Sequence, residues 1–118
     1  MKETGESVAV DLIKPDRYSK MQENALEVSE MLKILANPSR LLILCSLIHG
    51  PLTVTKIAEH VPNISQSALS QNLAKMRSAG ILRSEKTGLS VNYSIDDTRI
   101  FNVMGVLEQY YCGVKDEE

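Results

Sequence analysis

Two cysteines, Cys45 and Cys112, carry the most reactive side chains of this sequence. They lie 67 positions apart and form no CxxC motif. A thiolate can attack a sulfane sulfur, and a second thiol can then resolve the adduct. A free cysteine can equally be a small buried hydrophobe, which suits Cys45 within the apolar run LLILCSLI. The residues alone leave both interpretations open.

Metal binding and catalysis have weaker support. His49 and His60 lack the local thiol or carboxylate pattern of a metal site, so surface or structural roles are favoured for them. No nucleophile has a recognisable base, and there is no phosphate-binding loop. We therefore predict that the chain is not an enzyme and has no cofactor and no metal site.

The segment from Ser65 to Gly80, SQSALSQNLAKMRSAG, predicts an amphipathic helix. Its apolar side consists of Leu69, Leu73 and Met76. The opposite side, called the reading face below, consists of Ser67, Gln71, Ala74 and Ser78. A glutamine can pair with an adenine edge and a serine can donate or accept, so this face suits a DNA major groove. An ordinary solvated face is the alternative.

The charge of the chain is unevenly distributed. The formal net charge is -2, but residues 53–95 carry five basic and two acidic residues, which makes that segment +3. A basic segment within an otherwise acidic chain is compatible with contact to DNA phosphates. The candidate DNA-binding residues are Ser65, Gln66, Ser67, Ser70, Gln71, Lys75, Arg77, Arg83, Lys86 and Asn92.

The elements that position these residues follow from apolar spacing and breakers. The expected order is helices over 21–36, 38–49, 53–61 and 65–80, strands over 81–85 and 91–95, and a last helix capped by Asp96 or Asp97. A helix-turn-helix followed at once by a β-hairpin is a winged helix, here mainly α with a small β-hairpin wing in the order ααααββα. Arg83, Lys86 and Asn92 would lie on the wing, near phosphates or the minor groove.

The domain organisation follows from the same pattern. Residues 1–19 are interpreted as a mobile arm or short helix, 20–114 as one DNA-binding and dimerisation domain, and 115–118 as an acidic tail. The helix over 21–36 and the last helix offer apolar faces for a homodimer. A two-fold dimer would bind a pseudo-palindromic operator. Gln71 and the serines of the reading face would read A·T-containing half-sites, and Lys75 and Arg77 would contact phosphates.

The location of the protein is predicted from the absence of apolar runs. Asp11 interrupts the stretch from Val8 to Ile13, so residues 1–20 contain no signal peptide, and no later stretch approaches a membrane span. We expect a cytoplasmic protein with no membrane partner, in which a permanent structural disulfide is not expected.

Three segments together resemble the ArsR/SmtB family of bacterial repressors from about Met21 to Val114: LKILANPSRLLIL, SQSALSQNLAKMRSAG and a wing ending in NYSID. Within the family, LCSL around Cys45 and YYC ending at Cys112 are similar to the BigR, SqrR, YgaV and HlyU branch. The resemblance implies a repressor of operator DNA whose Cys45 and Cys112 respond to reactive sulfur species or oxidants, with lower DNA affinity as the result. Asn72 stands where histidine is common, which bears on the operator sequence.

The terminal helix offers a further expectation from the residues. Phe101, Gly105, Glu108 and Cys112 share one stripe, and a helical glycine costs about 1 kcal/mol relative to alanine. We therefore expect the helix of Cys45 to pack closely against Gly105. Extra sulfur atoms would relax the distance limit of a direct disulfide, so either a polysulfide or a disulfide remains possible.

Three alternatives remain open at this point. A metal-responsive repressor lacks its usual signals, because Thr53 to Val61 contains no cysteine and Asp97 to Cys112 no histidine. An antirepressor of the HlyU type would bind DNA with the opposite output. A protein-interaction winged helix that never touches DNA is favoured only by the acidic total charge.

Overall fold

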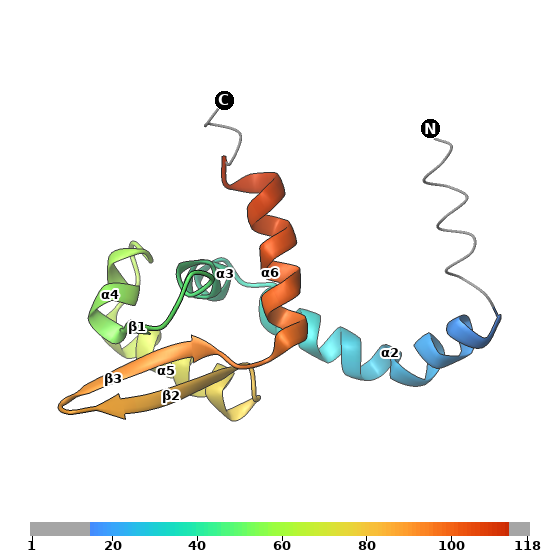
Figure 1. The fold of residues 1–118 in the computed structure, drawn as a ribbon, viewed down its shortest axis with the longest axis horizontal. Coiled ribbons are helices and arrows are strands. Elements are labelled where there is room, and N and C mark those ends of the chain that lie inside the picture. The colour runs from blue at the N-terminus through green and yellow to red at the C-terminus, as the bar shows by residue number, and fades with distance from the viewer. Residues whose placement is uncertain (1–14, 114–118) are drawn as a thin grey trace. The chain divides into compact units, whose positions relative to one another are not determined.

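The computed structural model describes residues 15–113. Residues 1–14 of the predicted arm and the predicted acidic tail lie outside the described residues. The described residues divide into two compact units at the boundary between Ile34 and Leu35. The first contains nearly all of helix α2, and the second contains every other element (Figure 1).

Helix α2 spans Pro15–Leu35, so it starts six residues before the Met21 start that the apolar spacing predicts. The extra residues lack an apolar period. They contain other helix signals instead, a proline at the first position and Asp16 in the first turn, both of which favour a helix N-terminus. Its apolar side chains remain largely in solvent, with exposed fractions of 73% for Leu26 and 55% for Met21.

Helix α3 (Pro38–Ser46) begins where the sequence predicts. Asn37 caps it by accepting a hydrogen bond from the backbone N–H of Arg40 at 3.0 Å, and Pro38 occupies its first turn. The predicted helix to His49 is shorter in the structure, because residues 47–49 form turns that lead to Gly50 at φ 141°. Ile43 and Leu44 are fully buried, which makes α3 the central helix of this unit.

The helix-turn-helix consists of α4 (Val54–Glu59) and α5 (Gln66–Ser78). Thr53 and Ser65 cap the two helices, each accepting a hydrogen bond from a backbone N–H with its side-chain oxygen. The connecting turn contains Asn63 at φ 62°, a left-handed conformation that asparagine tolerates better than most residues. After α5, Gly80 adopts φ 82°, the left-handed conformation in which glycine commonly ends a helix.

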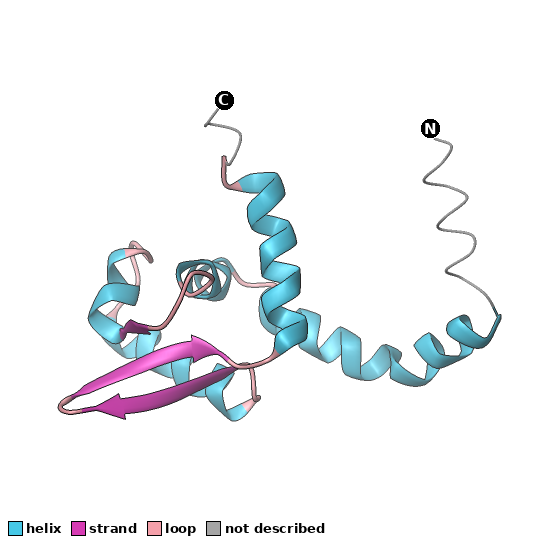
Figure 2. Ribbon diagram, in the orientation of Figure 1, coloured by secondary structure: helices cyan, strands magenta, loops and turns pink. Residues whose placement is uncertain are grey.

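The wing is the hairpin of β2 (Leu82–Thr87) and β3 (Ser90–Ile95), which extends away from the helices (Figures 1 and 2). Thr87 pairs with Ser90, which leaves Gly88 and Leu89 as the two-residue loop, with Gly88 at φ 65°. A short strand that the sequence analysis missed, β1 (Leu52–Thr53), pairs with the other edge of β3. The sheet is therefore three-stranded and antiparallel, in the order β1-β3-β2.

Helix α6 (Thr98–Tyr111) closes the fold and packs against α3 and β3. Asp97 caps it by accepting hydrogen bonds from the backbone N–H groups of Arg99 and Ile100, which settles the choice between Asp96 and Asp97. Ile100 and Met104 are buried, whereas Tyr111 at the end of the helix is 81% exposed.

The apolar core of the second unit draws on all of its helices and on the sheet. Its buried members are Leu35, Ile43, Leu44, Leu47, Ile48, Ile57, Val61, Leu69, Leu73, Met76, Ile81, Leu82, Ile100 and Met104. The mainly α winged helix-turn-helix fold with the helix and hairpin order ααααββα is therefore confirmed, with β1 as an addition.

Candidate functional site

Helix α5 separates its two sides as the period of 3.6 residues predicts. Leu73 and Met76 are fully buried and Leu69 is 1% exposed, because they pack into the core beside the sheet. The reading face, Ser67, Gln71, Ala74 and Ser78, is exposed along the whole helix. A helix whose outer side carries small and amide side chains can enter a major groove closely.

The candidate DNA-binding residues of this segment all reach solvent: Ser65, Gln66, Ser67, Ser70, Gln71, Lys75 and Arg77 are exposed. One of them has a structural task already, since the Ser65 hydroxyl accepts from the Ala68 N–H at 3.0 Å. Arg77 turns toward the wing, where its guanidinium donates to the Ser84 hydroxyl at 3.4 Å.

The candidate residues of the wing differ in their exposure to solvent and in their contacts. Lys86 is exposed near the hairpin tip, while Arg83 pairs with Asp96 at 3.3 Å on the surface. Asn92 is half-buried, because it lies on the central strand between Thr53 of β1 and Glu85 of β2.

The two cysteines, 67 positions apart in the sequence, are brought together by α3 and α6. Cys45 is half-buried on α3, and Cys112 is exposed at the C-cap of α6, near enough to the Cys45 thiol to influence its pKa. Burial raises the pKa of the Cys45 thiol, and Cys112 and the Glu108 carboxylate raise the same pKa further. The fold therefore brings Cys45 and Cys112, called the thiol pair below, into the same neighbourhood.

The expected close packing of the Cys45 helix against Gly105 is wrong. A side chain placed at Gly105 would meet nothing within 4 Å, so no element packs closely against that glycine in the described part of the chain. Glu108, near the C-terminal end of α6, instead reaches His49 in the turn after α3. Gly105 therefore carries no packing role that the structure explains.

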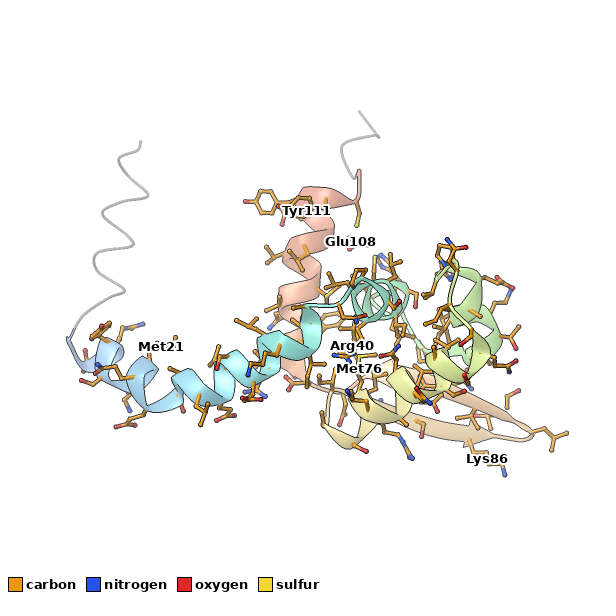
Figure 3. The ribbon with its side chains drawn as sticks, turned by 180° about the vertical axis from the view of Figure 1, so that it is seen from behind. Met21, Arg40, Met76, Lys86, Glu108 and Tyr111 are labelled. Carbon is orange, nitrogen blue, oxygen red and sulfur yellow. The ribbon has the colours of Figure 1, made fainter. Side chains whose placement is uncertain are left out.

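A carboxylate and an imidazole lie beside the thiol pair. Glu108 Oε2 and His49 Nε2 are 2.7 Å apart and join α6 to the turn after α3. Figure 3 shows Glu108 on the side of α6 that faces α3, with Tyr111 pointing away from it. In the sequence, His49 has no carboxylate nearby, because Glu108 lies 59 positions away and leaves no local signal.

The second histidine has a local structural contact. Nδ1 of His60 donates to the carbonyl oxygen of Lys56 at 3.0 Å, one turn earlier. Among residues 15–113, no group of three or more His, Cys, Asp or Glu side chains is arranged to hold a metal ion.

Comparison with known proteins decides which family this arrangement represents. The family described as "Bacterial regulatory protein, arsR family" matches residues 37–84. The transcriptional activator HlyU of Vibrio cholerae is 34% identical over 98 residues, which are 83% of this chain and 90% of HlyU. This chain belongs to the ArsR family. The HTH-type transcriptional regulator YgaV of Escherichia coli is 33% identical over 80% of this ArsR-family chain and 95% of its own length.

Solved structures of ArsR-family proteins share the fold. Reduced HlyU from Vibrio cholerae has a TM-score of 0.73 at 34% identity, over 79% of this chain and 97% of that one. The transcriptional repressor BigR from Xylella fastidiosa also has a TM-score of 0.73, at 27% identity, over 81% of this chain and 97% of BigR. The predicted branch with HlyU, YgaV and BigR is thereby confirmed.

Membership of the ArsR family makes this protein a DNA-binding transcriptional regulator, as the sequence analysis predicts. HlyU, YgaV and BigR are all named as transcriptional regulators. No helix of this ArsR-family protein within residues 15–113 has the length and apolarity to cross a membrane.

The pKa of the Cys45 thiol in this ArsR-family protein leads to a testable prediction. Glu108→Gln removes one of the charges that raise this pKa, so the pKa should fall and the thiolate fraction near pH 7 should rise. We expect Cys45 to be alkylated by iodoacetamide roughly threefold faster, and the pH profile of its rate to move to lower pH, since charges near the surface interact moderately. Both proteins should carry Cys112→Ser, so that only Cys45 reacts.

Glu85→Gln on the wing strand β2 is the control for this experiment. It removes the same charge away from α3 and α6, so the alkylation rate should not change. An equal acceleration by both substitutions would mean that the overall charge of the protein, rather than Glu108, tunes Cys45.

Proposed function

We propose that this ArsR-family protein is a repressor whose DNA affinity falls when Cys45 and Cys112 become crosslinked by reactive sulfur species or oxidants. The observation that carries the proposal is the proximity of the two thiols at the contact between α3 and α6. Both helices lie in the same compact unit as the helix-turn-helix, so a bond between them acts on the body that holds α5.

The two thiols are suited to different steps of a crosslinking reaction. Cys112 is exposed, so its thiolate can attack the outer sulfur of a low-molecular-weight persulfide, releasing the donor as a thiol and leaving Cys112 as a persulfide. The Cys45 thiol then attacks the inner sulfur of that persulfide, and hydrogen sulfide leaves as the disulfide forms. If Cys45 has also been persulfidated, the same displacement yields a trisulfide and hydrogen sulfide.

Mass spectrometry of the intact protein and of its proteolytic peptides tests this reaction. After treatment with glutathione persulfide, we expect a peptide that joins Cys45 to Cys112. With a disulfide this peptide is two hydrogens lighter than the two reduced peptides together, and each additional bridging sulfur adds about 32 Da to the disulfide mass. Peroxide treatment in parallel shows whether a general oxidant forms the same bond. Separate adducts on the two cysteines with no joined peptide would overturn the proposal.

Homodimerisation is part of the proposed function, and exposed apolar side chains support it. Both α2 and α6 carry such residues on their surfaces: Tyr18, Met21, Leu26, Leu32, Phe101, Val106, Tyr110 and Tyr111. Apolar patches of this kind mark interaction surfaces in soluble proteins. A two-fold dimer would present two copies of α5 to a pseudo-palindromic operator.

We propose that Gln71 reads bases while Lys75 contacts phosphate. Gln71→Ala should relax the preference for A·T-containing half-sites, with a loss of about ten- to hundredfold on the preferred duplex and little change on others. Lys75→Ala should weaken binding to every duplex alike. It should also reduce the slope of log binding constant against log salt concentration by about one, because one phosphate contact is lost. Fluorescence anisotropy on matched duplexes at several salt concentrations measures both.

The experiment also tests the orientation of α5. If Lys75→Ala changes sequence preference and Gln71→Ala does not, the reading face is wrongly assigned. If neither substitution changes binding to any duplex, α5 does not contact DNA.

An antirepressor is a second candidate, because the relative HlyU is named a transcriptional activator. Such a protein would use the same DNA contacts and thiol pair but would displace another repressor. Transcription from the bound promoter with this protein as the sole regulator separates the two, since a repressor lowers transcription there and an antirepressor does not.

A further inference from the structure

Arg40 joins the central helix to the reading helix. Its Nε donates a hydrogen bond to Oδ1 of Asn72 on α5 at 3.0 Å, across 32 positions of sequence. The side chain is half-buried at the start of α3, in the region of Met76 in Figure 3. A charged donor in a partly buried, directional contact is among the stronger hydrogen bonds of a protein.

Asn72 does not share the exposure of its neighbours on α5. Gln71 is exposed on the reading face and Leu73 is fully buried, while Asn72 lies half-buried between these two sides. Its carbonyl oxygen is used by Arg40, so this residue holds α5 against α3. The bearing of Asn72 on the operator sequence stays a prediction, and the structure adds its contact with Arg40.

The same short helix carries Arg40 and Cys45. The two residues are five positions apart on α3, which corresponds to roughly 7.5 Å along a helix axis. Between them, Ile43 and Leu44 are fully buried, so α3 is firmly packed in the core. One end of α3 therefore faces the thiol pair and the other end contacts α5.

We propose that the Arg40–Asn72 hydrogen bond is the link through which a crosslink of the thiol pair lowers the DNA affinity of α5. This inference rests on the proposed function. A bond between Cys45 and Cys112 draws the end of α3 toward α6, and the resulting tilt of α3 moves Arg40 away from Asn72. The planar guanidinium tolerates little change in direction, so the hydrogen bond breaks and α5 loses the contact that fixes its orientation.

The test compares DNA affinity of the reduced and crosslinked forms of the full chain, with crosslinking confirmed by mass spectrometry. In the unsubstituted protein, the crosslinked form should bind more weakly than the reduced form. The quantity compared is the ratio of the DNA affinity of the reduced form to that of the crosslinked form. This ratio should shrink about fivefold in Asn72→Ala and in Arg40→Lys, which keeps the charge but loses the guanidinium, while the crosslink still forms. Asn102→Ala, an exposed asparagine of α6, is the matched control and should keep the full ratio.

A double substitution makes the result specific to the contact. Arg40→Lys with Asn72→Ala should reduce the ratio no further than either change alone, because both remove the same hydrogen bond. A full ratio in both single variants, or losses that multiply in the double variant, would overturn the link. Thermal unfolding of each variant identifies any that fails to fold, and Asn72→Gln then replaces Asn72→Ala as a milder change with the same expected direction.

Failure of the link and failure of the proposed function give different results. If the unsubstituted protein forms the crosslink without losing DNA affinity, the thiol pair is not the regulatory site and the link is overturned with it. If the unsubstituted protein releases DNA and the variants release it equally, the thiol pair regulates by another route and only the link is wrong.

Discussion

Serine in place of either Cys45 or Cys112 is expected to abolish release from DNA by persulfide while leaving DNA binding by the reduced protein within about twofold. Serine is close to cysteine in size, and the two cysteines lie on α3 and at the end of α6 rather than on α5, so the reduced fold should persist. A crosslink needs both sulfur atoms. The loss for the unsubstituted protein should be roughly tenfold or more, as is usual for coupling between two sites.

The measurement is anisotropy with a duplex selected from a random library, with and without glutathione persulfide. The double variant Cys45→Ser with Cys112→Ser is the control and should respond no more than either single variant. Normal release from both single variants would rule out the thiol pair as the sensor.

Leu73→Ala is expected to have the largest effect on stability of the substitutions considered. Leu73 is fully buried on the inner side of α5, so truncation removes apolar contacts and leaves a cavity, at a cost of about 2–5 kcal/mol in the free energy of unfolding. A protein of 118 residues has only about 5–15 kcal/mol in total, so the variant should unfold at much lower urea concentration.

Ser78→Ala on the reading face is the matched control, with an expected change within about 0.5 kcal/mol because the side chain is exposed. Urea unfolding followed by circular dichroism, at one fixed protein concentration, compares the two. Equal midpoints for Leu73→Ala and the unsubstituted protein would mean that the two sides of α5 are reversed.

Local sequence signals predicted most of the fold, because they act within one turn of the chain. Thr53, Ser65 and Asn37 cap helices as their types suggest, and Gly80 adopts the left-handed conformation that ends α5. The apolar period placed Leu69, Leu73 and Met76 in the core. These features depend on neighbours in sequence, and a single sequence contains them.

Contacts between distant segments were less predictable. Strand β1 is two residues long and forms because Leu52 pairs with Tyr93 and Thr53 with Asn92. No local sequence pattern predicts such a strand. The contacts of Arg40 with Asn72 and of His49 with Glu108 likewise join separate elements. Gly105 was misread for a related reason, since glycine in a helix indicates a close approach only when some element is there.

The pairing of β1 with β3 has a consequence for the DNA itself. It ties the segment before α4 to the central strand of the wing, so the hairpin and the helix-turn-helix are held in one arrangement. In the proposed binding mode, the separation between a major-groove contact from α5 and a minor-groove contact from the hairpin tip is then set before any duplex binds. A duplex whose groove widths differ from that separation must bend or twist to fit, and sequences that deform easily gain affinity at base pairs that no side chain touches.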